Sequence, residues 1–156
     1  MRMGIDIGGT KIVAGIVDNS GKVVARKKIF VGHQKRYPVV RDAIADMVLD
    51  LLSEKTIPRE SLKRIGLACA GQIDKDFKKI IFSPNLGWHN APIREDIEAL
   101  LGINAFVEND VNAATYGEWR FGAAKGTGHV LGVFIGTGIG GGIIINGKVF
   151  RGFRNA

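Results

Sequence analysis

Residues 4–18 read GIDIGGTKIVAGIVD and residues 132–146 read GVFIGTGIGGGIIIN, and the two stretches follow one plan. Each begins with an apolar run, passes through a turn of Gly and Thr, and returns as a second apolar run. A shift of 128 positions places identical residues on one another: Gly4 on Gly132, Ile7 on Ile135, Gly8 on Gly136 and Ile16 on Ile144. A Gly-Lys turn and a further apolar run follow in both copies. The repeat predicts two related β-hairpins near the two ends of the chain.

The glycine turns of these hairpins suggest a chemistry. Backbone N–H groups that no side chain covers bind phosphate oxygens, so two such hairpins facing each other would hold one polyphosphate. A dinucleotide fingerprint requires a helix after the glycines, but residues 142–147 read GIIING, which is a strand. GGTK at residues 8–11 is too short for a Walker loop. Two tight hairpins without a ligand remain the alternative on this evidence.

Composition limits the class of protein. The chain has 156 residues, of which 46% are hydrophobic, and no apolar run approaches the ~20 residues that span a bilayer. The one cysteine, Cys69, lies in the apolar run IGLACA, where we expect a buried, inert thiol. No signal peptide is recognisable, and we expect a cytoplasmic protein without membrane partners. The net charge of +7 is scattered over the sequence, and it suits an anionic ligand such as a nucleotide.

The periodicity of the rest of the chain predicts alternating strands and helices. A third strand follows the first hairpin, and helices are predicted over residues 38–54, from Pro92 to Gly102 and from 110 to 122. Strands are predicted at 63–70, 78–84, 103–109 and 130–136, and residues 85–90 are expected to form a loop. This order predicts an α/β fold with a mixed sheet.

Four motifs together resemble the ROK sugar kinases, a family of glucokinases and hexosamine kinases. They are DIGGTK (6–11), SPNLGW (83–88), VENDVNAATYGE (107–118) and GTGIGGGIIINGK (136–148). The resemblance implies an actin-like ATPase fold, which is ribonuclease H-like, with a mixed β-sheet flanked by helices. ROK repressors share these motifs but carry a helix-turn-helix ahead of them. Since the first strand begins at residue 4, we expect a kinase and no nucleic-acid partner.

The resemblance also implies a reaction, the transfer of the ATP γ-phosphoryl group to a sugar hydroxyl. Asp110 matches the catalytic base, although an Asp at a strand–helix junction is also a common N-cap. Asn85, Asn109 and Asp110 match residues that bind the sugar, and Glu108 is expected to support the loop. Gly71 matches a glycine that approaches the sugar, but its surroundings, CAGQID, depart from the family pattern.

Further residues match the sites for ATP and Mg²⁺. Asp6 is expected to orient Mg²⁺ through water, because a carboxylate within an apolar strand needs a cation or hydrogen-bond donors. The first phosphate-binding turn comprises Gly8, Gly9, Thr10 and Lys11, and the second comprises Gly136, Thr137 and Gly138. His33, His89 and His129 show no metal-ligand spacing.

The repeat divides the chain into residues 1–126, an N-terminal actin-like lobe, and residues 127–156, the opening hairpin of a second lobe. The resemblance implies that a structural zinc site, further sugar-binding acids and the adenosine pocket lie in the rest of that lobe, outside these residues. We therefore expect a truncated N-terminal part with little kinase activity alone, and a homodimer or another association through the incomplete lobe. A non-catalytic, sugar-responsive ROK regulator or remnant and an actin-fold enzyme acting on a small carboxylate are the alternatives.

Overall fold

The computed structural model describes residues 1–32, 35–136, 138–153 and 155. Its largest sheet has five strands in the order β3-β2-β1-β4-β8. The strands are β1 (Arg2–Ile7), β2 (Lys11–Val17), β3 (Val23–Phe30), β4 (Arg64–Cys69) and β8 (Ala105–Asn109). β1, β2 and β3 pair antiparallel, whereas β4 lies parallel to both β1 and β8. The predicted mixed sheet is confirmed.

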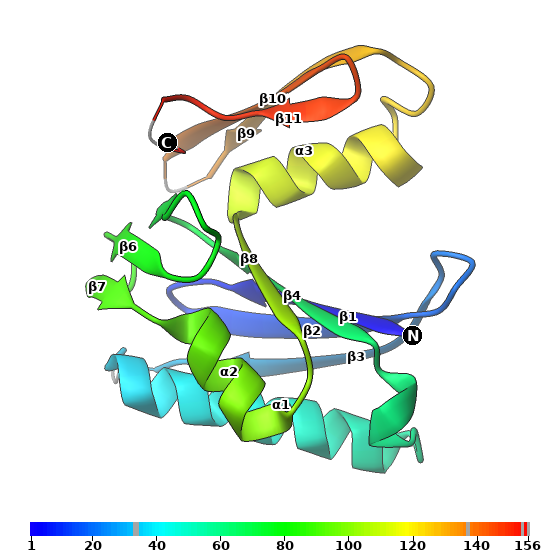
Figure 1. The fold of residues 1–156 in the computed structure, drawn as a ribbon, viewed down its shortest axis with the longest axis vertical. Helices are drawn as coiled ribbons and strands as arrows, with labels where there is room; N and C mark the ends of the chain where they lie inside the picture. The colour runs from blue at the N-terminus through cyan, green and yellow to red at the C-terminus, as the bar shows by residue number, and fades with distance from the viewer. Residues whose placement is uncertain (33–34, 137, 154, 156) are drawn as a thin grey trace.

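Two helices, α1 (Tyr37–Glu54) and α2 (Ile93–Leu101), cover one face of this sheet (Figure 1). A proline in the first turn of α1 fits the fixed φ of that position. Gly102 ends α2 with a φ of 62°, a left-handed conformation that glycine adopts without strain. Both predicted helices are confirmed. A short 3-10 helix, η1 (Arg59–Ser61), follows α1.

The core lies between these helices and the sheet. Alternate residues of β1, namely Met3, Ile5 and Ile7, are 1–2% exposed, and their neighbours on β2 and β4 are also buried. Val40, Ile44, Val48 and Leu51 are buried on α1. Because side chains alternate along a strand, the other residues of β1, Gly4 and Asp6, point to the opposite face of the sheet.

The opposite face carries α3 (Asp110–Phe121), which lies between the five-stranded sheet and a second sheet (Figure 1). This sheet is an antiparallel meander of β9 (His129–Ile135), β10 (Ile139–Ile145) and β11 (Lys148–Phe150). Glycines let α3 approach it closely. A Cβ built on Gly132 or Gly142 would overlap Oγ1 of Thr115, and one on Gly140 would lie 2.6 Å from Cγ2 of Val111.

A third, small sheet contains β5 (Gln72–Ile73), β6 (Ile80–Ser83) and β7 (Trp88–Ala91). The prediction of a loop at 85–90 is therefore wrong in its second half, where β7 begins. Trp88 is buried, and its indole N–H donates to the carbonyl of Lys35 at 2.6 Å. β7 has only four residues, which is too short for a periodic pattern to predict a strand. The contact that holds it comes from a segment 53 positions away in the sequence.

The repeat is present in three dimensions, with one correction. Ile7 pairs with Ile12 across the first turn, whereas Ile135 pairs with Ile139 across the second, which is one residue shorter. The shift of 128 positions therefore holds for β9 but becomes 127 in β10. The counterpart of Ile16 is Ile143 and not Ile144, because Ile16 pairs with Met3 and Ile143 pairs with Leu131. None of the described helices is long and apolar enough to cross a membrane.

Candidate functional site

The predicted site residues gather where three neighbouring strands end. β1, β4 and β8 run parallel, and Asp6, Ala68 and Glu108 lie side by side in their register. The carboxyl ends of parallel strands meet at one edge of the sheet, so residues that follow them lie close together. This edge brings together Asp6, Gly71 and the start of α3.

Asp6 and Asp110 line one pocket of about 400 Å³, which Val111, Ala113 and Phe134 also line. Partial burial raises the pKa of Asp6, the negative charge of Asp110 raises it further, and the positive charge of Lys11 lowers it. The two predicted carboxylates therefore interact, although 104 positions separate them in the sequence. Phe134 belongs to β9, so both sheets contribute to this pocket.

The N-cap of α3 is Asn109 and not Asp110. Oδ1 of Asn109 accepts hydrogen bonds from the backbone N–H groups of Val111 and Asn112, at 3.0 and 3.1 Å. Asp110 is the first helical residue, and its Oδ1 accepts from the N–H of Val111 at 2.9 Å. The cap alternative for Asp110 is wrong because the neighbouring amide fills that position, which leaves the Asp110 carboxylate facing the pocket.

The first glycine turn connects β1 and β2. The N–H of Gly8 donates to the carbonyl of Lys11 at 3.0 Å, and a Cβ on Gly8 would lie 2.9 Å from that oxygen. A Cβ on Gly9 would lie 3.1 Å from the carbonyl oxygen of Asn85, so the turn abuts the segment between β6 and β7. Thr10 is exposed, and its carbonyl accepts from the N–H of Val31. The structure thus brings Asn85 to the first turn.

The second glycine turn connects β9 and β10. The N–H of Gly136 donates to the carbonyl of Gly138 at 2.9 Å, and both residues are exposed. No described atom lies within 4 Å of a Cβ built on either, so the turn is open. Thr137 lies outside the described residues. Both glycine turns lie at the same end of the molecule, on the left in Figure 1.

Gly71 and Asn109 meet in a neighbouring pocket of about 360 Å³. The side-chain amide of Asn109 donates to the carbonyl of Gly71 at 3.1 Å. Gly71 has a φ of 148°, and a Cβ there would overlap the carbonyl oxygen of Phe82. The close approach of the β6 backbone therefore requires glycine at position 71, independently of any ligand in the pocket.

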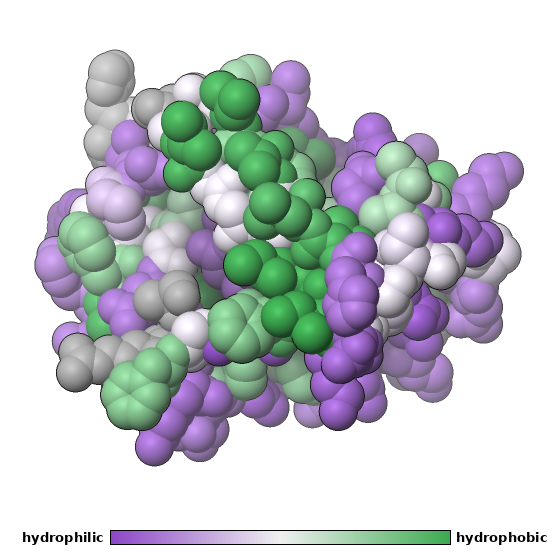
Figure 2. Space-filling view, turned by 90° about the horizontal axis from the view of Figure 1, so that it is seen from above, coloured by the Kyte–Doolittle hydropathy of each residue, from purple (hydrophilic) through white to green (hydrophobic). Residues whose placement is uncertain are grey.

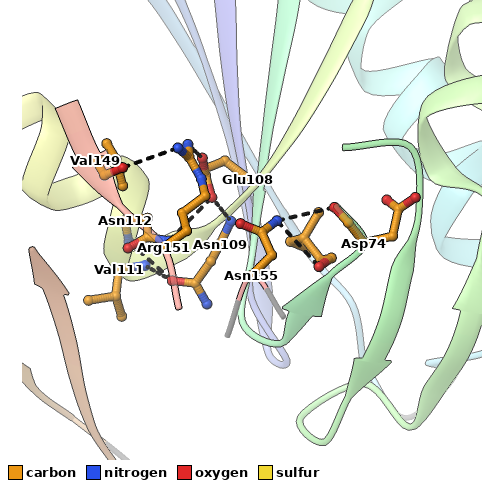
Figure 3. A network of polar contacts seen from close by, with 9 residues as sticks. Asp74, Glu108, Asn109, Val111, Asn112, Val149, Arg151 and Asn155 are labelled. Carbon is orange, nitrogen blue, oxygen red and sulfur yellow. Dashed lines mark hydrogen bonds and ion pairs between the residues drawn. The ribbon is translucent and has the colours of Figure 1, made fainter. Parts of the chain in front are cut away.

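A polar network that the sequence did not reveal closes this pocket (Figure 3). Arg151, just after β11, pairs with Glu108 and lies 4.8 Å from the ring centroid of Phe77. Glu108 also accepts from the N–H of Asn109 and from the side chain of Asn112, which fits its expected role as a support of the loop. Asn155 donates to the carbonyls of Ile73 and Asp74 at 3.4 and 3.1 Å. No local pattern in the sequence indicates the contacts of Arg151 and Asn155, because they join the last residues to β8 and to the segment at β5.

Cys69 is buried, as expected. Burial raises the pKa of its thiol to about 12, and the charges of Asp110 and Asp6 act in the same direction. Such a thiol is inert at neutral pH. Among the described residues no three His, Cys, Asp or Glu side chains form a metal-binding group. His33 lies outside the described residues.

The strand order, the place of α3 and the carboxylates at the strand ends define the class. The chain has an α/β structure with the actin-like ATPase fold, which its structural neighbours share. A model of the ROK family matches residues 2–156, and the chain belongs to the ROK family.

The named relatives within this family include both kinases and repressors. Over 152 residues the chain is 38% identical to a glucokinase of Streptomyces coelicolor, covering 97% of this chain and 46% of that protein. It is 34% identical to a xylose repressor of Bacillus subtilis, covering 96% and 38%. A solved ROK glucokinase of Streptomyces griseus, in complex with glucose and AMPPNP, is 36% identical, with a TM-score of 0.89 and coverage of 99% and 47%. The chain thus spans about half the length of the glucokinases it matches.

Proposed function

We propose that this chain binds the phosphates of ATP and a hexose or hexosamine in an ATP-dependent sugar kinase. The observation that carries the proposal is the pocket shared by Asp6 and Asp110, at the edge where both glycine turns lie. The glucokinase relatives and the solved complex with glucose and AMPPNP support the same reaction. Residues 1–126 and 127–156 are proposed as one lobe and the beginning of another, and the isolated chain as weak or inactive.

Asp110 is proposed as the catalytic base. Its carboxylate accepts the proton of the attacking sugar hydroxyl, whose oxygen forms a bond to the γ-phosphorus. The bond from that phosphorus to the β–γ bridging oxygen breaks, and ADP leaves with the electron pair. The N-cap at Asn109 fixes the first turn of α3, so the protein holds Asp110 in place before the sugar binds.

The remaining predicted residues are proposed to position the two substrates. Gly8, Gly9, Thr10 and Lys11 would hold ATP phosphates on one side, and Gly136, Thr137 and Gly138 on the other. For the sugar, Asn85 and Asn109 are proposed to hydrogen-bond its hydroxyls, and the backbone of Gly71 is proposed to approach it. One side-chain N–H of Asn109 donates to the carbonyl of Gly71, and the second N–H of the same amide group can donate to a sugar hydroxyl.

Mg²⁺ fits the pocket of Asp6 and Asp110. Burial raises the pKa of Asp6, and the negative charge of Asp110 raises it further, because two neighbouring carboxylates repel each other unless a proton or a cation lies between them. Oxygen ligands are those that Mg²⁺ prefers, and the ion usually keeps several waters. Asp6 would hold the ion through water, and the ion would supply positive charge to neutralise the phosphates.

A single-chain chimera tests this function. Residues 1–156 replace the matching portion of the Streptomyces coelicolor glucokinase, and ADP release is followed with glucose. The account expects turnover that Asp110→Asn lowers at least ~10²-fold, as for loss of a general base. Asp46→Asn, an exposed carboxylate on α1, is the matched control and should change nothing. Full turnover in the Asp110→Asn chimera would refute the assigned base.

A sugar-responsive regulator is the second candidate, and the identity with a xylose repressor favours it. It predicts that the chimera binds sugar in calorimetry without releasing ADP. Asp110→Asn would then leave the sugar affinity unchanged.

A further inference from the structure

Arg151 connects the second sheet to the strand that leads into α3. It follows β11, and its guanidinium pairs with Glu108 of β8 (Figure 3). The same guanidinium lies 4.8 Å from the ring centroid of Phe77 and donates to the carbonyl of Val149 at 3.4 Å. One cation therefore joins β11, β8 and the segment between β5 and β6.

Glu108 extends this contact to the start of α3. Its Oε2 accepts from Arg151, while its Oε1 accepts from the N–H of Asn109 at 3.0 Å and from the side-chain amide of Asn112 at 3.3 Å. Asn109 is the N-cap of α3, and Asp110 follows it directly. A carboxylate held at both oxygens has one orientation, because rotation would break the charge-assisted bond to the guanidinium. Arg151 therefore fixes the side chain of Glu108, and Glu108 fixes the cap beside Asp110.

The β9–β11 sheet meets α3 in a second way, through one of its faces. Gly132 and Gly142 lie so close to α3 that a Cβ on either would overlap the side chain of Thr115. The outer face of the sheet is exposed and apolar, and Figure 2, seen from this end of the molecule, shows a continuous hydrophobic band. Close packing thus holds the helix along its length, and Arg151 acts on the residues at its first turn.

The ion pair adds little to the stability of the fold. The side chains of Arg151 and Glu108 are 31% and 23% exposed, and ion pairs that water reaches contribute little to the free energy of folding. Nε of Arg151 is buried and has no hydrogen-bond partner among the described residues, which is unfavourable. Its effect on the neighbouring site explains this arrangement better than stability does.

We propose that Arg151 is a positioning residue for the sugar kinase reaction, a role that rests on the proposed function. Through Glu108 it holds the first turn of α3, so that Asn109 and the carboxylate of Asp110 meet the sugar hydroxyls in one orientation. Arg151 itself takes no part in proton or phosphoryl transfer. An uncharged side chain at position 151 would release Glu108, and the cap would move Asp110 away from the attacking hydroxyl.

Arg94 provides a matched control at the other end of β8. It pairs with Glu98 at 3.1 Å, its side chain is 27% exposed, and its guanidinium lies 5.2 Å from the ring centroid of Phe106. Glu98 also accepts from the backbone N–H of Ala105, where β8 begins. The two arginines therefore make the same kinds of contact, but Arg151 lies at the proposed sugar site and Arg94 lies at the opposite end of the strand.

Kinetics of the single-chain chimera test the proposal. Arg151→Met should lower kcat at least ~10-fold and raise KM for glucose at least ~3-fold, since a small displacement of catalytic and binding groups is costly. KM for ATP should change less than ~2-fold, because no residue of this network belongs to a glycine turn. A variant that only folds less well would lower kcat without changing either KM. Arg94→Met should leave all three values unchanged.

A double variant tests whether Arg151 acts through Glu108. Glu108→Gln should have the same effect as Arg151→Met, and the double variant should lose no more than either single variant, since each change breaks the same ion pair. Losses that multiply would overturn the proposal. Unchanged kinetics in Arg151→Met, where the parent chimera is active and Asp110→Asn is not, would overturn the role of Arg151 alone. An inactive parent chimera would overturn the proposed function together with this role.

Amide hydrogen exchange in the 156-residue chain tests the positioning without any turnover. In Arg151→Met the amides of Asn109, Val111 and Asn112 should exchange at least ~10-fold faster, because the cap opens locally. Arg94→Met should leave these three amides unchanged. Unchanged exchange in Arg151→Met would overturn the proposal whether or not the chimera is active. Faster exchange along the whole chain in both variants would also overturn it, because the ion pair would then serve only the stability of the fold.

Discussion

The meanders β1–β2–β3 and β9–β10–β11 carry apolar residues at corresponding positions and share a pair of facing glycines, yet they are covered on opposite sides. The glycines are Gly4 and Gly15 in the first meander and Gly132 and Gly142 in the second. In the first, α1 covers the apolar face and the glycine face is open. In the second, α3 covers the glycine face and the apolar face is open. A hydrophobic pattern in a strand therefore shows which face is suited to burial, but whether that face is buried depends on helices elsewhere in the polypeptide.

The largest expected contrast comes from truncating residues at corresponding positions of the two meanders. Ile5→Ala removes a side chain that is 2% exposed, and it should lower the free energy of unfolding by about 2–5 kcal/mol. Val133→Ala removes its exposed counterpart in the second meander, and the change should stay within about 0.5 kcal/mol. Urea denaturation of the two variants measures both. Equal losses would mean that the outer face of β9–β11 is already buried in the isolated chain.

The facing glycines give a smaller contrast of the same kind. Gly142→Ala places a methyl group against Thr115, and we expect a loss of about 1–3 kcal/mol in urea denaturation from overpacking. Gly15→Ala meets only ordinary contacts, so the loss of chain flexibility in the unfolded state should make it neutral or stabilising by up to about 1 kcal/mol. A similar loss in both variants would show that the first glycine pair is already tightly packed.

The two meanders also differ at one position in the candidate site, where Asp6 corresponds to Phe134. The pKa of Asp6 is higher in the folded protein than in the unfolded chain, so the folded protein binds this proton more tightly. Ionisation of Asp6 therefore destabilises the folded state as the pH rises. Asp6→Asn should therefore raise the Tm at pH 7, and the gain should vanish as the pH falls below the ordinary value of 3.8. Thermal melts from pH 3 to 7 measure this. A lower Tm for Asp6→Asn at pH 7 would show that a partner stabilises the carboxylate.

Thiol reactivity distinguishes the closed and open faces with the smallest disturbance of the fold. Cys69 is buried beside the first meander, and its pKa near 12 keeps it protonated at pH 8. It should react with an aromatic disulfide reagent only when the chain unfolds, and the parent chain provides that baseline. A cysteine introduced at position 133 should react in the native state. Rapid labelling of Cys69 itself in native buffer would contradict the described burial.

The sequence predicted most of the elements, and the family resemblance named both carboxylates that share the pocket. Pro38, Pro92 and Gly102 mark helix ends through their own backbone preferences, which explains why α1 and α2 were predicted accurately. What it did not predict depends on distant contacts. β7 is fixed by the packing of Trp88, and Arg151 reaches Glu108 from the end of β11. The shift of the repeat by one residue has a local cause, the shorter second turn.

Hydrogen exchange tests most directly the claim that the apolar face of β1–β2–β3 is covered in the isolated chain and that of β9–β10–β11 is not. In the isolated chain, amides of β1 and β2 should exchange only through global unfolding, whereas those of β9 and β10 should exchange at least ~10²-fold faster through local opening. Addition of the unmatched portion of the Streptomyces coelicolor glucokinase should slow β9 and β10 to the rate of the first meander. Equal protection of the two meanders in the isolated chain, unchanged by that addition, would contradict the account.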